Sequence, residues 1–198
     1  AAQLERPTTA PQSQIFDLYA FERHSSDDGC GRRRLTALAR SITGPQGKVI
    51  GVDFTEKMMA RARSNAEKLG YNNVEFRYGD VESMPLNDSI ADVVVSNCVL
   101  NLVPDKTRAF AETFRILRPG GHFSVSDIVL KGELPEGLRA SAEMYAGCVS
   151  GAVQKEEYLS VVRAAGFTSL KLQKERKITI PDEILSVYLD IPASRKLV

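Results

Sequence analysis

The sequence predicts an α/β protein with a doubly wound, mainly parallel sheet of about seven strands and an antiparallel edge strand. Short β-branched runs alternate along the chain with longer stretches of helical periodicity. One run, ADVVVS at 91–96, is apolar almost throughout, as is typical of a strand buried on both faces. Two more extended runs near the C-terminus, joined by a short link, indicate an antiparallel pair at the sheet edge.

The first half of the chain alternates helices and strands after a polar start. Apolar residues at i, i+3 and i+4 predict a short helix over 14–22. A helix over 35–42 would end at the Gly-Pro pair that follows it. The β-branched run KVIGV predicts a strand over 48–52. An amphipathic helix over 55–69 begins with a threonine suited to the N-cap and is followed by Gly70, suited to a left-handed ending residue.

The second half repeats the alternation. VEFRY at 74–78 alternates like a strand, and phenylalanines at i and i+4 mark a helix over 104–117. The RPGG sequence at 118–121 predicts a turn before a strand over 122–129. The remaining predicted elements are a helix over 155–165, strands over 170–176 and 177–180, and a helix over 181–189 with proline at its first position.

Composition excludes several classes of protein. Lys and Arg number 26 and Asp and Glu 25 among 198 residues, so no strong field favours nucleic acid or an anionic membrane. No apolar run is long enough to span a bilayer. Three cysteines without paired spacing do not form a disulfide framework, which favours a reduced, cytoplasmic protein. We expect residues 1–24 to form a partly mobile extension and 25–198 a single domain.

Acidic residues follow two of the predicted strands. Ligands of an open parallel sheet bind at the carboxyl ends of its strands. Asp53 ends the 48–52 strand and lies 22 residues after Gly31 (53 − 31), a placement that suits ribose hydroxyls. Asp80 follows the 74–78 strand and could accept the exocyclic amine of an adenine, with Val81 against the ring. Each aspartate could equally be an ordinary loop residue.

A thiol follows a third predicted strand. Cys98 comes directly after the 91–96 strand, in the middle of the expected cleft. Most buried cysteines are small hydrophobic core residues, and that alternative stays open for Cys98. Cys148 lies among small residues, which permit either close backbone approach or tight helix packing.

Residues 44–176 resemble the class I S-adenosylmethionine-dependent methyltransferases and, within them, the arsenite methyltransferases. The resemblance rests on GKVIGVD at 47–53, SNCVLNLVPDK at 96–106, LRPGG at 117–121, SDI at 126–128, GELP at 132–135 and YAGCVSGA at 145–152. It implies a Rossmann-like sheet and methyl transfer from S-adenosylmethionine to trivalent arsenic. The two cysteine-containing motifs, at 96–106 and 145–152, are the most specific part of the resemblance.

The resemblance also implies roles for individual residues. Cys98 and Cys148 match the cysteines whose thiolates bind arsenic, a soft element that pairs with soft sulfur. The implied cofactor contacts are Gly29, Gly31, Asp53, Phe54, Asp80, Val81 and Asn97. The expected partners are arsenite or thiol-bound arsenic and a small thiol or thioredoxin-type reductant. Arsenic's own lone pair would attack the methyl group, so the protein's task is positioning.

Two other functions stay open. The chain could be a methyltransferase that acts on another small molecule, such as a quinone. It could also be a non-catalytic binding protein, because Arg33 stands where the related glycine loop has its third glycine and its side chain would obstruct that loop.

Overall fold

The computed structural model describes residues 2–5, 14–18, 43–44, 46–133, 149 and 151–178. The strands are β1 (Ala2–Glu5), β2 (Gln14–Leu18), β3 (Lys48–Asp53), β4 (Val74–Tyr78), β5 (Ala91–Asn97), β6 (Leu117–Ser126) and β7 (Ser169–Leu172). The helices are α2 (Glu56–Lys68), the short 3-10 helix η1 (Leu100–Leu102), α3 (Lys106–Ile116) and α6 (Lys155–Ala164). The helices predicted over 35–42 and 181–189 lie outside the described residues.

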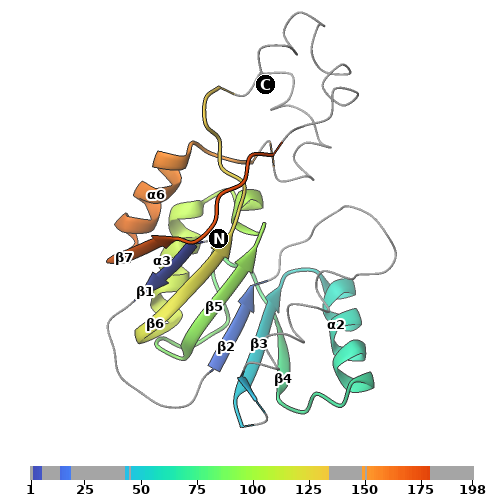
Figure 1. Ribbon diagram of the computed structural model, residues 1–198. Coiled ribbons are helices and arrows are strands. Elements are labelled where there is room, and N and C mark those ends of the chain that lie inside the picture. The colour runs from blue at the N-terminus through green and yellow to red at the C-terminus, as the bar shows by residue number, and fades with distance from the viewer. Residues whose placement is uncertain are drawn as a thin grey trace, which may run out of the picture.

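The strands form one seven-stranded sheet in the order β4-β3-β2-β5-β6-β1-β7 (Figure 1). The pairs β4-β3, β3-β2, β2-β5 and β5-β6 are parallel, whereas β1 is antiparallel to both of its neighbours. This arrangement confirms the prediction of a mainly parallel sheet. The strands predicted over 48–52, 74–78 and 91–96 are present as β3, β4 and β5.

Two predictions for the ends of the chain are wrong. Residues 14–18 form the central strand β2 rather than a helix, because the segment pairs on both sides, with β3 and with β5. The antiparallel edge pair consists of β7 and β1, and residues 173–178 contain no strand. Residues 179–180 lie outside the described part of the chain. The domain boundary at residue 24 stays a prediction, although β1 and β2 precede it.

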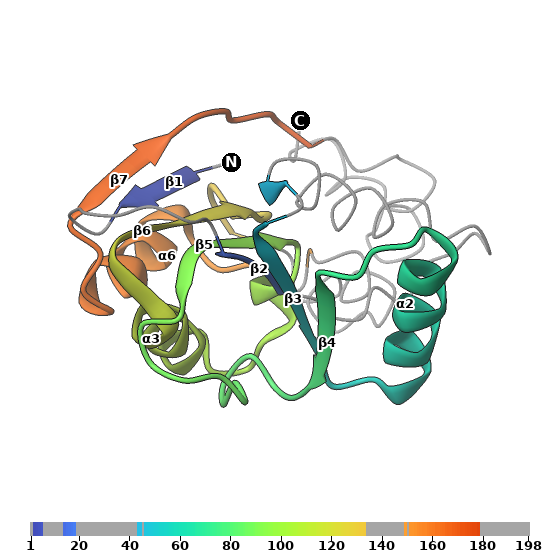
Figure 2. The same ribbon diagram turned by 90° about the horizontal axis from the view of Figure 1, so that it is seen from below.

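Helices cover the two faces of the sheet. Met59 and Ala66 of α2 pack on Phe76 of β4. Ile50 of β3 points to the opposite face and joins the main core with residues of α3 and α6. Figure 2 shows α3 and α6 gathered beside β5 and β6, and α2 beside β4. The sheet is therefore doubly wound, as predicted.

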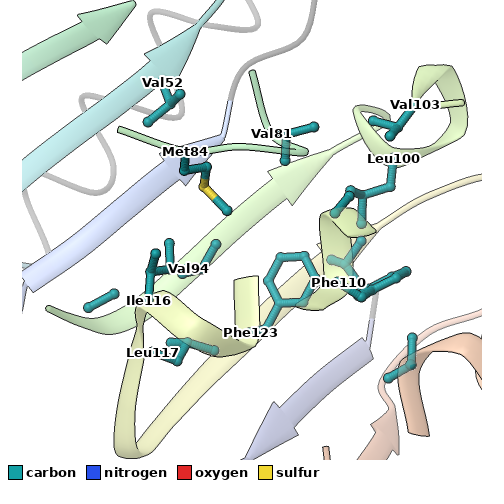
Figure 3. Packing of buried hydrophobic residues seen from close by; sticks show 14 of the residues in the cluster. Val52, Val81, Met84, Val94, Leu100, Val103, Phe110, Ile116, Leu117 and Phe123 are labelled. Carbon is teal, nitrogen blue, oxygen red and sulfur yellow. The ribbon is translucent and has the colours of Figure 1, made fainter. Parts of the chain in front are cut away.

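The main core lies between the sheet and the helices α3 and α6 (Figure 3). Phe110 of α3 is fully buried and meets Phe123 of β6 edge-on, with ring centroids 5.9 Å apart. Tyr158 of α6 contacts the same Phe110 ring edge-on at 5.4 Å. These aromatic contacts fix α6 over the carboxyl-terminal part of β6. None of the helices that the structure describes is long and apolar enough to cross a membrane.

The predicted turn at 118–121 lies within a strand. β6 already begins at Leu117, and its register with β5 shifts between Ala91 and Val93, so residues 118–121 form a bulge rather than a separate turn. Gly120 has φ +88, which a side chain rarely tolerates. The strand itself ends at Ser126, three residues before the predicted end.

Gly121→Ala should lower the free energy of unfolding by about 1–3 kcal/mol. A Cβ at this position would lie 2.8 Å from the carbonyl oxygen of Asp92 and 3.0 Å from that of Arg118, and backbone cannot give way as a side chain can. Urea unfolding followed by circular dichroism measures the effect. Arg118→Ala is the control: its partly exposed ion pair with Asp92 should contribute under about 1 kcal/mol. Equal losses from the two changes would contradict the close contact.

Candidate functional site

The carboxyl ends of five parallel strands gather at one edge of the sheet, as β3 and β5 show in Figure 1. Leu18 of β2 pairs with Val52 of β3 on one side and with Ser96 of β5 on the other. Two strand spacings therefore separate Asp53 from Asn97, about 10 Å. A ligand lying across β2 would meet the ends of both neighbouring strands.

Asp53 ends β3 and is only 4% exposed. Its Oδ1 accepts the backbone N–H of Thr55 at 2.7 Å, which closes a local turn in front of α2. Phe54, the next residue, is 50% exposed. A buried carboxylate beside an accessible aromatic ring suits a ligand that has hydroxyl groups and a flat ring.

The end of β4 lies directly beside Asp53. The Gly79 N–H donates to the Asp53 carbonyl oxygen at 3.1 Å, and this brings the exposed Asp80 close to the β3 end. Asp80 Oδ1 accepts the Glu82 N–H at 2.9 Å. Val81 is 8% exposed and packs in the main core, so most of its side chain faces the protein.

Gly79 is a position whose importance sequence reasoning missed. A Cβ there would lie 2.4 Å from Cδ of Pro85, so only glycine lets this turn pass Pro85. The sequence signal was the glycine between the β4 strand and Asp80, but the proline that excludes a side chain lies six residues further on.

Cys98 directly follows β5 and is partly exposed. Its φ is +56, in the left-handed region that favours glycine. The Cys98 N–H donates to the carbonyl oxygen of Ser126 at 2.8 Å, and this bond ties the residue to the end of β6. Asn97, just before it, is exposed and pairs with Ser126 in register. The structure thus places Cys98 at the edge of the sheet that was predicted from the sequence.

Three of the predicted site residues, Gly29, Gly31 and Cys148, lie outside the described residues, so their roles stay predictions. The structure brings together Asp53, Phe54 and Asp80 at one end of the row of strand ends. It places Asn97 and Cys98 across β2 from them.

A hydrogen-bonded pair of a partly buried aspartate and a buried tyrosine, near Cys98, was not predicted. Asp127 follows Ser126, and its Oδ2 accepts the hydroxyl of Tyr158 at 2.6 Å. Burial raises the pKa of Asp127 to about 7, against the opposing effects of the Tyr158 hydrogen bond and the Lys106 charge. Burial also raises the pKa of Tyr158, helped by the charges of Asp127 and Cys98. An acidic residue at the end of a buried strand is the same sequence signal that singles out Asp53.

Lys106 adds a positive charge to this region. Its Nζ donates to the carbonyl oxygens of Asn101 at 3.4 Å and Val103 at 3.1 Å. Burial lowers the pKa of Lys106, against the opposing charges of Asp127 and Glu157. The lysine therefore ties the chain after Cys98 to the start of α3.

The Asp127 carboxyl should make stability fall as the pH rises. Its pKa is about 7 in the folded chain, against 3.8 for an ordinary aspartate such as that of the unfolded chain. Between these two pH values the folded chain therefore holds a proton that the unfolded chain has lost. Stability present at low pH is then lost as the pH rises through about 7. Asp127→Asn should remove this dependence, on the order of 1–4 kcal/mol between acid and mildly alkaline pH. Urea unfolding across that range measures it, with the exposed Asp88→Asn as control; parallel profiles for wild type and Asp127→Asn would refute it.

Comparisons with known proteins identify the family to which the chain belongs. Residues 26–166 match a family model described as a methyltransferase domain. An arsenite methyltransferase from Halobacterium salinarum is 39% identical over 142 residues, which are 72% of this chain and 36% of the relative. A 27-O-demethylrifamycin SV methyltransferase from Amycolatopsis mediterranei is 31% identical and is matched over 91% of this chain and 68% of its own length.

A solved structure with a similar fold is that of an arsenic(III) S-adenosylmethionine methyltransferase from Chlamydomonas reinhardtii. Its TM-score is 0.65 and its identity 33%, over 82% of this chain and 55% of that one. This chain spans between 36% and 49% of the curated arsenite methyltransferases that it matches. With the family model covering most of the chain and the parallel sheet in place, the chain belongs to the methyltransferase-domain family and has the class I methyltransferase fold.

Proposed function

We propose that this chain transfers the methyl group of S-adenosylmethionine to trivalent arsenic held by cysteine thiolates. The observation that carries the proposal is the partly exposed Cys98 at the carboxyl end of β5, across one strand from the buried Asp53. Relatives called arsenite methyltransferases, 36–39% identical over most of this chain, support the choice of arsenic.

The residues at the strand ends fit the cofactor. Asp53 offers a carboxylate to the ribose hydroxyls, and the exposed ring of Phe54 offers a flat apolar surface to the adenine. Asp80 lies beside them with a carboxylate for the exocyclic amine. Gly29, Gly31, Val81 and Asn97 complete the proposed contacts. When bound, S-adenosylmethionine supplies a methyl group on a positively charged sulfur, an electrophile that needs no general base.

The chain's own task is then to hold arsenic in line with that methyl group. Cys98 and Cys148 would bind it as thiolates, since soft sulfur ligands suit arsenic. A small thiol would provide a third sulfur ligand, and a thioredoxin-type protein would serve as reductant. The reducing cytoplasm is the compartment in which such thiols persist.

The direct test is methyl transfer from labelled S-adenosylmethionine to arsenite in the presence of glutathione, with methylated arsenic separated by chromatography. We expect labelled methylarsenic to form only when the protein is present. Label transferred only to an added quinone or hydroxyl-bearing acceptor would replace arsenic with that substrate class. A calorimetric titration that shows no binding of S-adenosylmethionine would indicate a non-catalytic binding protein, the alternative in which Arg33 obstructs the glycine loop.

A further inference from the structure

One hydrogen bond connects helix α6 to the end of β6. The Tyr158 hydroxyl donates to Asp127 Oδ2 at 2.6 Å, and Tyr158 is only 5% exposed. Its ring meets Phe110 edge-on, so the hydroxyl has little freedom to find another acceptor. The hydrogen bond therefore joins two residues that are 31 positions apart in the sequence and ties α6 to the chain just after β6.

The same end of β6 holds Cys98. Its N–H donates to the carbonyl oxygen of Ser126, the residue immediately before Asp127. Cys98 has φ +56, and a non-glycine residue adopts this conformation only where its surroundings hold it there. The Ser126 carbonyl is one such restraint, so whatever fixes residues 126–127 also fixes the backbone from which the thiol projects.

Among the described residues, Tyr158 provides the one hydrogen bond that the Asp127 side chain makes with another side chain. Among the residues that the structure describes, Asp127 Oδ1 and the hydroxyl of Ser96 are buried and have no hydrogen-bond partner. Ser96 lies two residues after Val94 and so faces the same side of the sheet, the side covered by α3 and α6. Loss of the Tyr158 hydroxyl would leave both Asp127 oxygens without a hydrogen-bond partner among the described residues, which favours rearrangement of the segment.

We propose that Tyr158 and Asp127 are positioning residues for the Cys98 thiol: their hydrogen bond holds the end of β6, whose Ser126 carbonyl keeps Cys98 in its left-handed conformation at the cleft. The role of this thiol rests on the proposed function. The charge of Cys98 contributes to the raised pKa of Tyr158, which places the thiol within electrostatic reach of the pair.

The test measures the reactivity of Cys98 without arsenic or cofactor. Cys30→Ser and Cys148→Ser together leave Cys98 as the only thiol among the chain's three cysteines. In this background, the rate of alkylation by iodoacetamide is measured at about pH 9.5, where a thiol of ordinary pKa is ionised and the rate reports access. Tyr158→Phe should raise this rate about threefold or more, because an unanchored segment opens more often. Tyr78→Phe, at an exposed tyrosine, is the matched control and should change nothing.

Variants of Asp127 distinguish positioning from general loosening of the core. Asp127→Asn keeps an oxygen that accepts the tyrosine hydrogen bond and should react at close to the wild-type rate. Asp127→Ala loses it and should match Tyr158→Phe, while the double variant Tyr158→Phe/Asp127→Ala should react no faster than either single variant. If Tyr158→Phe does not fold, as judged by circular dichroism, the Asp127→Asn and Asp127→Ala comparison carries the same test.

Wild-type reactivity in folded Tyr158→Phe or Asp127→Ala would overturn the proposal, as would additive effects in the double variant. Failure of the proposed function gives a different result. A wild-type chain that does not bind arsenite removes the arsenic assignment and leaves the alkylation rates unaffected.

Discussion

Cys98→Ser is expected to weaken arsenite binding by at least about a hundredfold. Changing even a supporting group around a metal site costs about 10–100-fold in affinity, and Cys98 is proposed to contact arsenic directly. A serine hydroxyl is a hard oxygen ligand that stays protonated at neutral pH, so it cannot replace a thiolate on a soft element. The same loss is expected for Cys148→Ser, because one remaining thiolate cannot chelate.

Titration with arsenite, followed by calorimetry, measures both variants against the wild type. Cys30→Ser is the matched control: this cysteine is expected to be a small loop residue, and its replacement should leave arsenite affinity unchanged. A Cys98 or Cys148 variant that binds arsenite as tightly as the wild type would reduce that cysteine to a packing residue. The arsenic assignment would then lose its main support.

Three of the parallel strands, β3, β4 and β5, could be predicted from sequence because each is a short run that is either apolar or alternates between apolar and polar residues. β3, β4 and β5 lie within a residue of their predicted limits. The central strand β2 was missed for a tertiary reason. The run QIFDL also satisfies helical spacing over its few residues, and only pairing with β3 on one side and β5 on the other selects the extended form.

The candidate site shows the same limit. Asp53, Asp80 and Cys98 could be located because each lies at or just after the carboxyl end of a strand, and parallel strands end at one edge. The Tyr158–Asp127 hydrogen bond could not, because it depends on how α6 packs through Phe110 onto β6. Nor does the sequence reveal that Cys98 has a left-handed backbone, since nothing in SNCVLN marks that position as glycine-like.

Asp53→Asn should weaken binding of S-adenosylmethionine by about 10–150-fold, the equivalent of roughly 1.5–3 kcal/mol for a hydrogen bond to a charged acceptor. Asp53 is 4% exposed, so the hydrogen bonds that its carboxylate would accept from the ribose hydroxyls are shielded from competing water. Asparagine is chosen over alanine because its amide oxygen can still accept the Thr55 N–H that now bonds Oδ1 at 2.7 Å. The turn before α2 is thereby retained, and a loss of affinity reports the missing charge rather than a displaced helix.

Isothermal calorimetry with the cofactor measures this loss, and urea unfolding of the same samples verifies that the fold is intact. Asp88→Asn is the matched control, because Asp88 precedes β5 and so lies at the opposite edge of the sheet, where it pairs with Arg115. If Asp53→Asn and Asp88→Asn bind the cofactor equally well, the ribose does not lie at the end of β3. The buried carboxylate would then have its role in the local structure, which includes the turn before α2, and the cofactor contacts would have to be sought among the remaining strand ends.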